Sequence, residues 1–263
     1  MTSTTFASAI FNQSTLNMNT TKYWITAMVC VALGITSCSK DKNEVTAPVT
    51  ADSSIYNKLI VVKNFTGDTS SLTAPDADRS TIYFSLEQQK PAPAEYVLTN
   101  RWDMSFSGVY NTSIGGNFGN DNSSGSSLGK GGPGLGGVLI LSQSFDQVTK
   151  VPDNAVFSTQ AAPFGLDDAG SFGNGVGWAV YDWSGDLKAK LGFGGSSPEQ
   201  AHTCWARPDR TILVRTATGN YAKVQIISLY KDAPAEPVTH SLSPYFNFQY
   251  VIAKPGTKDF TIK

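Results

Sequence analysis

The sequence has few of the side chains that most metal sites and catalytic centres require. Its 263 residues include two His, His202 and His240, and three Cys, Cys30, Cys38 and Cys204. The Cys residues form no recognisable catalytic motif, and the His and Cys residues lack the paired spacing of zinc ligands. We therefore predict that the protein is not an enzyme, with neither catalytic residues nor a zinc site.

An excess of charge of either sign is also missing. The formal net charge is −1 and 16% of the residues are charged, so no surplus of Lys and Arg is present to displace counterions from phosphates. Gly132, Gly134 and Gly137 match the dinucleotide fingerprint G-x-G-x-x-G, but an apolar strand-like run, residues 138–141, follows where a helix is required. The sequence predicts no nucleic-acid partner and no nucleotide site.

Sustained helical periodicity is absent, and apolar residues alternate with polar ones instead. In residues 101–110, for example, Trp102, Met104 and Phe106 alternate with polar side chains such as Asp103. Strand-like segments cover residues 57–65, 80–86, 101–110, 138–141, 178–183 and 245–252, together with a hairpin at residues 211–230. This series predicts an all-β fold, a single domain of antiparallel hairpins.

The hairpin at residues 211–230 has the clearest pattern. Two β-rich runs flank a turn that contains Gly219 and Asn220, residue types that reach positive φ at low cost. The second run divides its side chains between two faces, with Ala222, Val224 and Ile226 on one and Tyr221, Lys223 and Gln225 on the other. We predict a strand with one buried and one solvated face.

Glycine is concentrated in one segment, because 11 of the 24 Gly fall within residues 108–137. Such a composition buries too little apolar surface to offset the entropy of ordering, which predicts a mobile surface loop. Residues 161–177 and 187–201 are expected to be further loops. The side-chain oxygens of Asp167 and Asp168 and those of Asn120, Asp121 and Asn122 are calcium-ligand types, but such residues are more typical of solvated turns.

The first 37 residues have the order of parts found in a bacterial lipoprotein signal peptide. Lys22 precedes an 11-residue apolar run, residues 25–35, which is too short to span a membrane comfortably as a helix. The run leads into Ile35, Thr36, Ser37 and Cys38, which are similar to the lipobox, where a peptidase cuts before a Cys that receives lipid. We predict removal of residues 1–37, with Met18 as an alternative start, and a palmitate-type lipid anchor on Cys38.

The residues that follow Cys38 are polar, and residues 38–56 are predicted to be a flexible tether. Their charged beginning is similar to the export signal that directs Bacteroidota lipoproteins to the outer face of the outer membrane. The predicted location is therefore the outer membrane, lipid-anchored at the cell surface, with periplasmic retention as the alternative. The expected β domain covers residues 57–263.

Four stretches of the chain resemble the HmuY family of haem-binding lipoproteins of Bacteroidota. They are residues 101–108, 146–152, 214–225 and 246–251, in the order found in the family, and the most specific is Val-Arg-Thr-Ala-Thr-Gly-Asn-Tyr-Ala-Lys-Val-Gln at residues 214–225. The resemblance implies a hand-shaped β fold whose long hairpins close over a planar ligand. It also implies iron acquisition, by capture of haem and its delivery to a TonB-dependent outer-membrane transporter.

The chain departs from the family where the resemblance implies axial His or Met ligands. Residues 160–177 and 182–201 contain neither type, which leaves His202, just beyond the second loop, as the candidate ligand of haem iron. Iron in haem also accepts a phenolate or a thiolate, so Tyr181 and Cys204 are alternatives. Further aromatic residues either stack on a porphyrin or pack in the core: Trp178, Trp183 and Phe193. Met104 and His240 are interpreted as a core residue and a turn residue.

The sequence thus predicts a non-catalytic surface lipoprotein that binds haem, with His202, Tyr181 and Trp183 as the candidate binding residues. The alternative is a related protein that has lost its haem ligands. Such a protein would act as an adhesin or a glycan-binding surface protein through exposed aromatic residues and Gly-rich loops.

Overall fold

The computed structural model describes residues 55–70, 77–119 and 127–262. All of them belong to the compact unit Pro48–Lys263. The predicted signal peptide, the predicted lipid attachment site Cys38 and residues 39–54 of the predicted tether lie outside the described residues.

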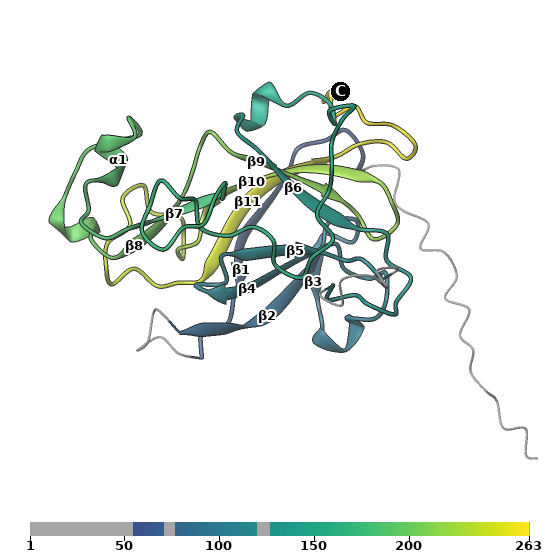
Figure 1. The fold of residues 1–263 in the computed structure, drawn as a ribbon, viewed down its shortest axis with the longest axis horizontal. Coiled ribbons are helices and arrows are strands. Elements are labelled where there is room, and N and C mark those ends of the chain that lie inside the picture. Colours follow the sequence, from purple (N-terminus) through teal and green to yellow (C-terminus); the bar gives the residue numbers. More distant parts are fainter. Residues whose placement is uncertain (1–54, 71–76, 120–126, 263) are drawn as a thin grey trace, which may run out of the picture. The chain divides into compact units, whose positions relative to one another are not determined.

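The largest sheet has five antiparallel strands in the order β1-β11-β10-β9-β6 (Figure 1). Its strands are β1 (Ile60–Thr66), β6 (Gly137–Leu141), β9 (Thr211–Arg215), β10 (Tyr221–Ser228) and β11 (Tyr245–Ile252). Neighbours in this sheet come from both ends of the chain, since β1 pairs with β11. The sheet therefore joins the first and last strands of the unit.

A second antiparallel sheet has the order β3-β2-β4-β5, and a separate pair is formed by β7 and β8. The strands are β2 (Asp78–Ser85), β3 (Lys90–Ala92), β4 (Met104–Val109), β5 (Ser113–Gly116), β7 (Ala179–Asp182) and β8 (Thr203–Ala206). Helical segments are short: α1 (Leu187–Lys190), η2 (Ala94–Tyr96), η3 (Phe145–Gln147) and η4 (Pro198–Gln200). The predicted all-β fold with antiparallel pairing is confirmed.

The core lies between the two larger sheets. Phe65 of β1 contacts Phe84 of β2 and Phe106 of β4 in edge-to-face geometry, with ring centroids 5.2 Å and 5.6 Å apart. Phe246 and Phe248 of β11 complete this aromatic cluster and are fully buried. Each such side chain contributes about 1.5–3 kcal/mol by burial, so this cluster dominates the packing of the sheets.

The predicted hairpin is confirmed, and its pairing places Arg215 opposite Tyr221. Gly219 has a φ of +89°, as the turn chemistry requires. The prediction of a solvated face was wrong for Lys223, which is buried. Its ammonium group donates to the carbonyl oxygens of Phe145 and Val148, at 2.8 Å and 2.9 Å, because the segment around η3 covers this face of β10.

Two other strands also differ from the simple alternation. Asp103, on the polar side of the β4 pattern, is buried because the hairpin turn covers it, and its carboxylate accepts from the backbone N–H groups of Leu86 and Ala217 at 2.7 Å and 2.9 Å. In β1, by contrast, apolar side chains are exposed, namely Val61 and Leu59 just before the strand, because one face of this edge strand is open to solvent.

The Gly-rich segment is more ordered than predicted. It contains β5, and Phe118 pairs with Leu135 in an isolated bridge. A Cβ on Gly116 would lie 2.6 Å from the Cα of Gly137, so glycine permits two backbones to touch here. The described part of residues 108–137 is thus a close-packed backbone layer, and its composition does not indicate mobility.

The domain core also begins slightly earlier than the sequence indicated. Ile55 and Tyr56, placed in the tether, are buried, and Tyr56 bridges to Ile252 at the end of β11. The expected loop at residues 187–201 contains α1 and η4.

Candidate functional site

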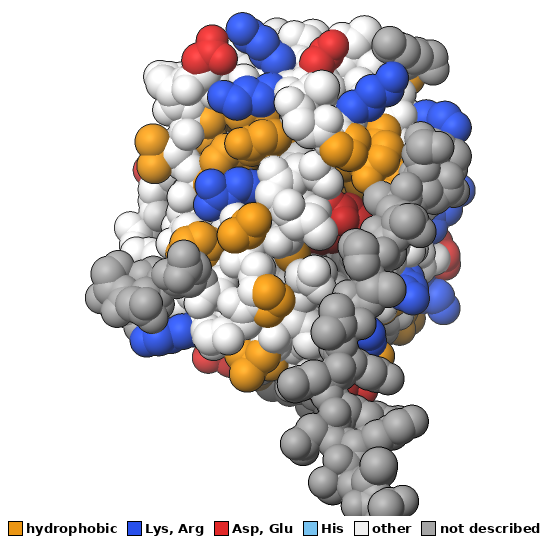
Figure 2. All heavy atoms as spheres, turned by 90° about the vertical axis from the view of Figure 1, so that its right-hand side faces the viewer, with side chains coloured by type: hydrophobic (Ala, Val, Ile, Leu, Met, Phe, Trp, Pro, Cys, Tyr) orange, Lys and Arg blue, Asp and Glu red, His pale blue; other side chains and the backbone are white. Residues whose placement is uncertain are grey.

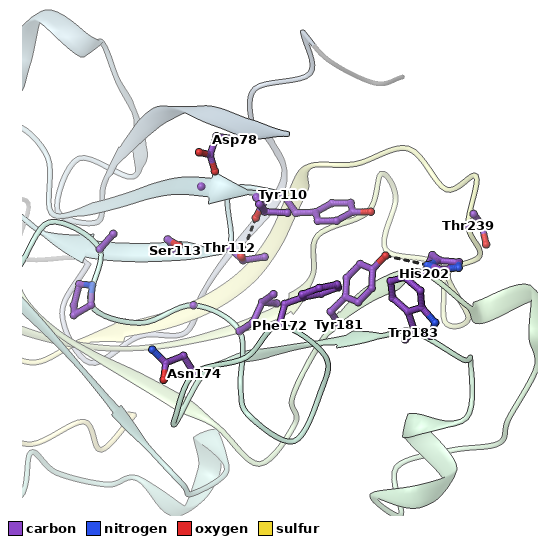
Figure 3. Close-up of a pocket in the computed structure, with 16 residues that line it drawn as sticks. Asp78, Tyr110, Thr112, Ser113, Phe172, Asn174, Tyr181, Trp183, His202 and Thr239 are labelled. Atoms are coloured by element: carbon purple, nitrogen blue, oxygen red, sulfur yellow. Dashed lines mark hydrogen bonds between the residues drawn. The ribbon is translucent and has the colours of Figure 1, made fainter. Parts of the chain in front are cut away.

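One cavity of about 940 Å³ opens beside the β7–β8 pair (Figure 3). Its walls come from the β4–β5 turn, the loop of residues 162–174, the end of β7, the start of β8 and the segment around Thr239. Clefts of 300–1,000 Å³ with apolar walls are the usual form of small-molecule sites. Three sequence candidates, His202, Tyr181 and Trp183, line this cavity.

Alternation along β7 explains how two of these side chains reach the cavity. Ala179, Tyr181 and Trp183 lie on one face of the strand, and their exposure increases from buried through half-buried to exposed. Tyr181 thus forms part of the cavity wall, while Trp183, 55% exposed, lies at its rim.

Pairing between β7 and β8 brings His202 to the same rim. Asp182 is opposite Thr203 in the register, so the next residues outward, Trp183 and His202, are neighbours across the strands. Their ring centroids are 4.6 Å apart in edge-to-face geometry. Tyr181 lies diagonally across, and its hydroxyl oxygen is 3.1 Å from Nδ1 of His202 (Figure 3).

Further aromatic rings complete the wall around Tyr181. The ring of Phe172 lies 5.4 Å from that of Tyr181 and 5.9 Å from that of Trp183, both edge to face. Tyr110, at the end of β4, lies 6.3 Å from Tyr181 on another side. The cavity therefore offers a set of rings that suits a flat, apolar ligand.

Three bulky residues that line this cavity have a strained backbone conformation. Tyr110, Phe172 and His202 all have positive φ, at 54°, 63° and 58°. The other non-Gly residues with positive φ in the described part of the chain are Asn57, Asn64, Gln89, Asn111, Asp232 and Ala233. Bulky side chains pay more for this conformation than Asn or Asp, and such strain is typical of functional sites.

Buried ion pairs hold the loop that carries Phe172. The carboxylate of Asp167 pairs with Arg207 at 2.8 Å and with Arg210 at 3.0 Å, and it accepts from the N–H of Gly177. Although burial opposes ionisation, these partners keep the pKa of Asp167 below its usual value. Asp167 is therefore neither a solvated turn residue nor an available calcium ligand.

The remaining sequence candidates lie away from the cavity. Trp178 is buried in the core and donates its Nε1–H to the carbonyl of Thr112 at 2.6 Å. Phe193 contacts Trp205, 6.2 Å between centroids. Cys204 points into the core, and burial raises the pKa of its thiol strongly, which disfavours a thiolate ligand. Two others do not line the cavity either: Met104, in the core, and His240, exposed.

Sequence reasoning missed Tyr110 and Phe172. Tyr110 follows a strand pattern and Phe172 lies in a Gly-rich loop, and neither position has a motif of its own. Only their approach to Tyr181 in the folded chain identifies them.

In the part of the chain that the structure describes, no group of three or more His, Cys, Asp or Glu is placed to hold a metal ion, and no helix is long and apolar enough to cross a membrane. Figure 2 shows the side of the molecule away from β7 and β8, where apolar side chains lie in small groups among polar and charged ones.

No protein-family model and no curated protein sequence matches the chain. Distant similarity exists to crystal structures, among them a Bacteroides fragilis protein described as a lipoprotein, 13% identical, with a TM-score of 0.37 over 74% of this chain and 91% of that one. Another is described as an HmuY-like haem-binding protein of Bacteroides vulgatus, which is 11% identical, with a TM-score of 0.33 over 73% of this chain and 90% of that one. A third is the apo HmuY analog of Tannerella forsythia, which is 12% identical, with a TM-score of 0.37 over 75% of this chain and 97% of that one. We therefore infer function from the cavity itself.

Proposed function

We propose that the protein binds haem, or a related flat hydrophobic ligand, in the cavity beside β7 and β8, without catalysing a reaction. The observation that carries this proposal is the convergence of Tyr181, Trp183 and His202 on one aromatic cavity of about 940 Å³. The sequence predicts the same three residues as the candidate haem-binding residues.

The donors present fit haem chemistry. Haem iron is held in proteins by imidazole or by phenolate, among other groups, and the cavity wall contains His202 and Tyr181. When bound, haem would supply an iron centre that takes such a ligand, while Phe172, Trp183 and Tyr110 would pack against apolar surface. The described lining residues include one carboxylate, Asp78, and no Lys or Arg, so the ligand's own carboxylates would remain in water.

The location and the partner belong to the same proposal. The lipobox-like end at Cys38 and the charged residues after it support a lipid anchor in the outer membrane, with the domain at the cell surface. A protein there would capture haem and deliver it to a TonB-dependent transporter, as the sequence resemblance to the HmuY family implies.

A titration tests the proposal. Ferric and ferrous haem are added to the full-length chain in mild detergent, and the Soret band is followed. We expect a saturable shift at micromolar haem, which Trp183→Ala weakens. Phe193→Ala, which removes an exposed ring outside the cavity, is the matched control and should leave binding unchanged. A wild-type chain without a saturable shift would contradict haem binding.

A second candidate function is supported by the exposure of two rings. Phe172 is 73% and Trp183 55% exposed, and Asn174 and Thr239 line the same cavity. Exposed rings beside polar groups also suit the faces of sugars. If haem fails to bind, a glycan array probed with wild type and Trp183→Ala tests the glycan-binding alternative, which requires signals that the variant loses.

A further inference from the structure

We propose that Tyr181, through its phenolate oxygen, is the iron ligand of the bound haem, and that His202 is a positioning residue that holds this oxygen by a hydrogen bond. This inference rests on the proposed haem-binding function. It differs from the sequence expectation, which assigned the iron to His202, and the contact between Tyr181 and His202 carries it.

The first reason is placement. Tyr181 stands on β7, whose pairing with β8 fixes its backbone, and its half-buried ring is surrounded by the rings of Tyr110, Phe172 and Trp183. His202 lies outside the strands with a φ of 58° and is exposed at the rim. A donor on a strand, with neighbours on several sides, is held more firmly than one on a strained rim residue.

The second reason is the hydrogen bond between the two side chains. Nδ1 of His202 lies 3.1 Å from the hydroxyl oxygen of Tyr181. This contact fixes the direction in which the Tyr181 oxygen points, because the imidazole holds it from the rim of the cavity. Partners that orient a ligand in this way are typical of metal sites.

The third reason concerns the other donors of the cavity. Its described lining includes no Cys, no Met and no second His, and its other phenol belongs to Tyr110, whose relative exposure is only 5%. A phenolate at this position would favour haem iron in the ferric state, because an anionic oxygen donor stabilises Fe(III) more than Fe(II).

The test uses the full-length chain with ferric haem and two matched substitutions. Tyr181→Phe and Tyr110→Phe each remove one hydroxyl from the same cavity and keep the ring. Absorption spectra and electron paramagnetic resonance of the complexes report the ligand directly. We expect high-spin ferric signals with a phenolate-to-iron charge-transfer band in wild type and in Tyr110→Phe, and loss of that band in Tyr181→Phe.

The role of His202 is tested separately. His202→Ala should keep the charge-transfer band but weaken affinity about 10- to 100-fold, the usual cost of losing a residue that orients a metal ligand. His202→Asn, which retains a hydrogen-bonding side chain and tolerates positive φ, should restore part of the affinity. Reduction with dithionite should weaken binding to wild type.

The outcomes separate this inference from the function it rests on. A wild-type chain that binds no haem overturns the function and the inference together. A chain that binds haem but keeps its spectrum in Tyr181→Phe, or loses iron coordination in His202→Ala, overturns the inference alone. Circular dichroism of each variant shows whether its fold is intact, and a Tyr181→Leu variant repeats the test if Tyr181→Phe is unfolded.

Discussion

At the scale of single residues, Asp103 shows how a buried carboxylate is tolerated in this fold. Its oxygens accept from three backbone N–H groups, those of Leu86, Glu87 and Ala217, and from the hydroxyl of Ser85. Desolvation and the nearby charge of Glu87 nevertheless raise the pKa of Asp103 to about 6. The protonated form of Asp103 is therefore more favoured in the folded protein than it is for an aspartate side chain in water.

This elevated pKa predicts a pH-dependent stability. The pKa of Asp103 in the folded state, about 6, exceeds the ordinary value of 3.8. Its stabilising contribution to the free energy of unfolding is therefore fully present below pH 4 and is lost as the pH rises through 6. A pKa difference of about two corresponds to about 3 kcal/mol. The free energy of unfolding, measured with urea at pH 4 to 7, should fall with rising pH in wild type relative to Asp103→Asn. Parallel curves for the two proteins would contradict the assignment.

Phe172 has a strained backbone conformation, and its exposed ring contributes little stabilisation by burial. Its φ is 63° and its side chain is 73% exposed. Phe172→Asn should raise the free energy of unfolding by up to about 1 kcal/mol, since Asn tolerates this conformation, and should weaken haem binding. Val176→Asn, which changes an exposed apolar residue of the same loop at ordinary φ, is the control for both urea unfolding and haem titration. Destabilisation by Phe172→Asn would show that the ring itself supports the fold.

At the scale of elements, the β9–β10 hairpin depends on a carboxylate from another sheet. Oε1 of Glu87, just after β2, accepts from the hydroxyls of Thr216 and Thr218 at 2.9 Å and 2.6 Å and from Nδ2 of Asn220 at 3.0 Å. The same turn donates Ala217 N–H to Asp103. The two sheets are thus joined through polar contacts at the hairpin turn as well as through the core.

These contacts predict an asymmetric effect of substitutions at Glu87. Glu87→Ala removes the acceptor and should lower the free energy of unfolding by about 1.5–3 kcal/mol, the range for hydrogen bonds to a charged group. Glu87→Gln keeps an oxygen and should cost less. Urea denaturation at pH 7 measures both, with Glu95→Ala on η2 as the surface control. Equal losses for Ala and Gln would indicate that charge, not the acceptor, matters.

The elements themselves could be predicted from the sequence because alternation is local. The faces of β4 and β10 could not, because Asp103 is covered by a hairpin turn more than a hundred residues later and Lys223 by the segment around η3. Composition likewise misjudged the Gly-rich segment, since it does not show that Gly116 lies against Gly137. The local sequence pattern of a strand does not show which distant segment packs on each of its faces.

At the scale of the whole molecule, the cavity gathers side chains from segments far apart in the chain. Tyr181, Trp183 and His202 could be named from an aromatic strand and a family resemblance, because they lie on or beside one strand pair. Tyr110 and Phe172 reach the same cavity only through the packing of the β4–β5 turn and the following loop. In a site of this kind, the residues on or beside the strands can thus be predicted from the sequence, whereas those on loops and turns cannot.

The predicted anchor and the cavity use different parts of the chain, which gives a final prediction. Among the residues that the structure describes, those that line the cavity fall between Asp78 and Thr239, whereas lipid is predicted on Cys38. Cys38→Ala should therefore abolish incorporation of labelled palmitate and release the protein from the membrane fraction, or leave the precursor unprocessed, while haem affinity stays unchanged. Cys30→Ala, within the predicted signal peptide, should still be labelled and anchored. Labelling of the Cys38→Ala variant would place the anchor elsewhere, and loss of its haem affinity would show that binding depends on the anchored state.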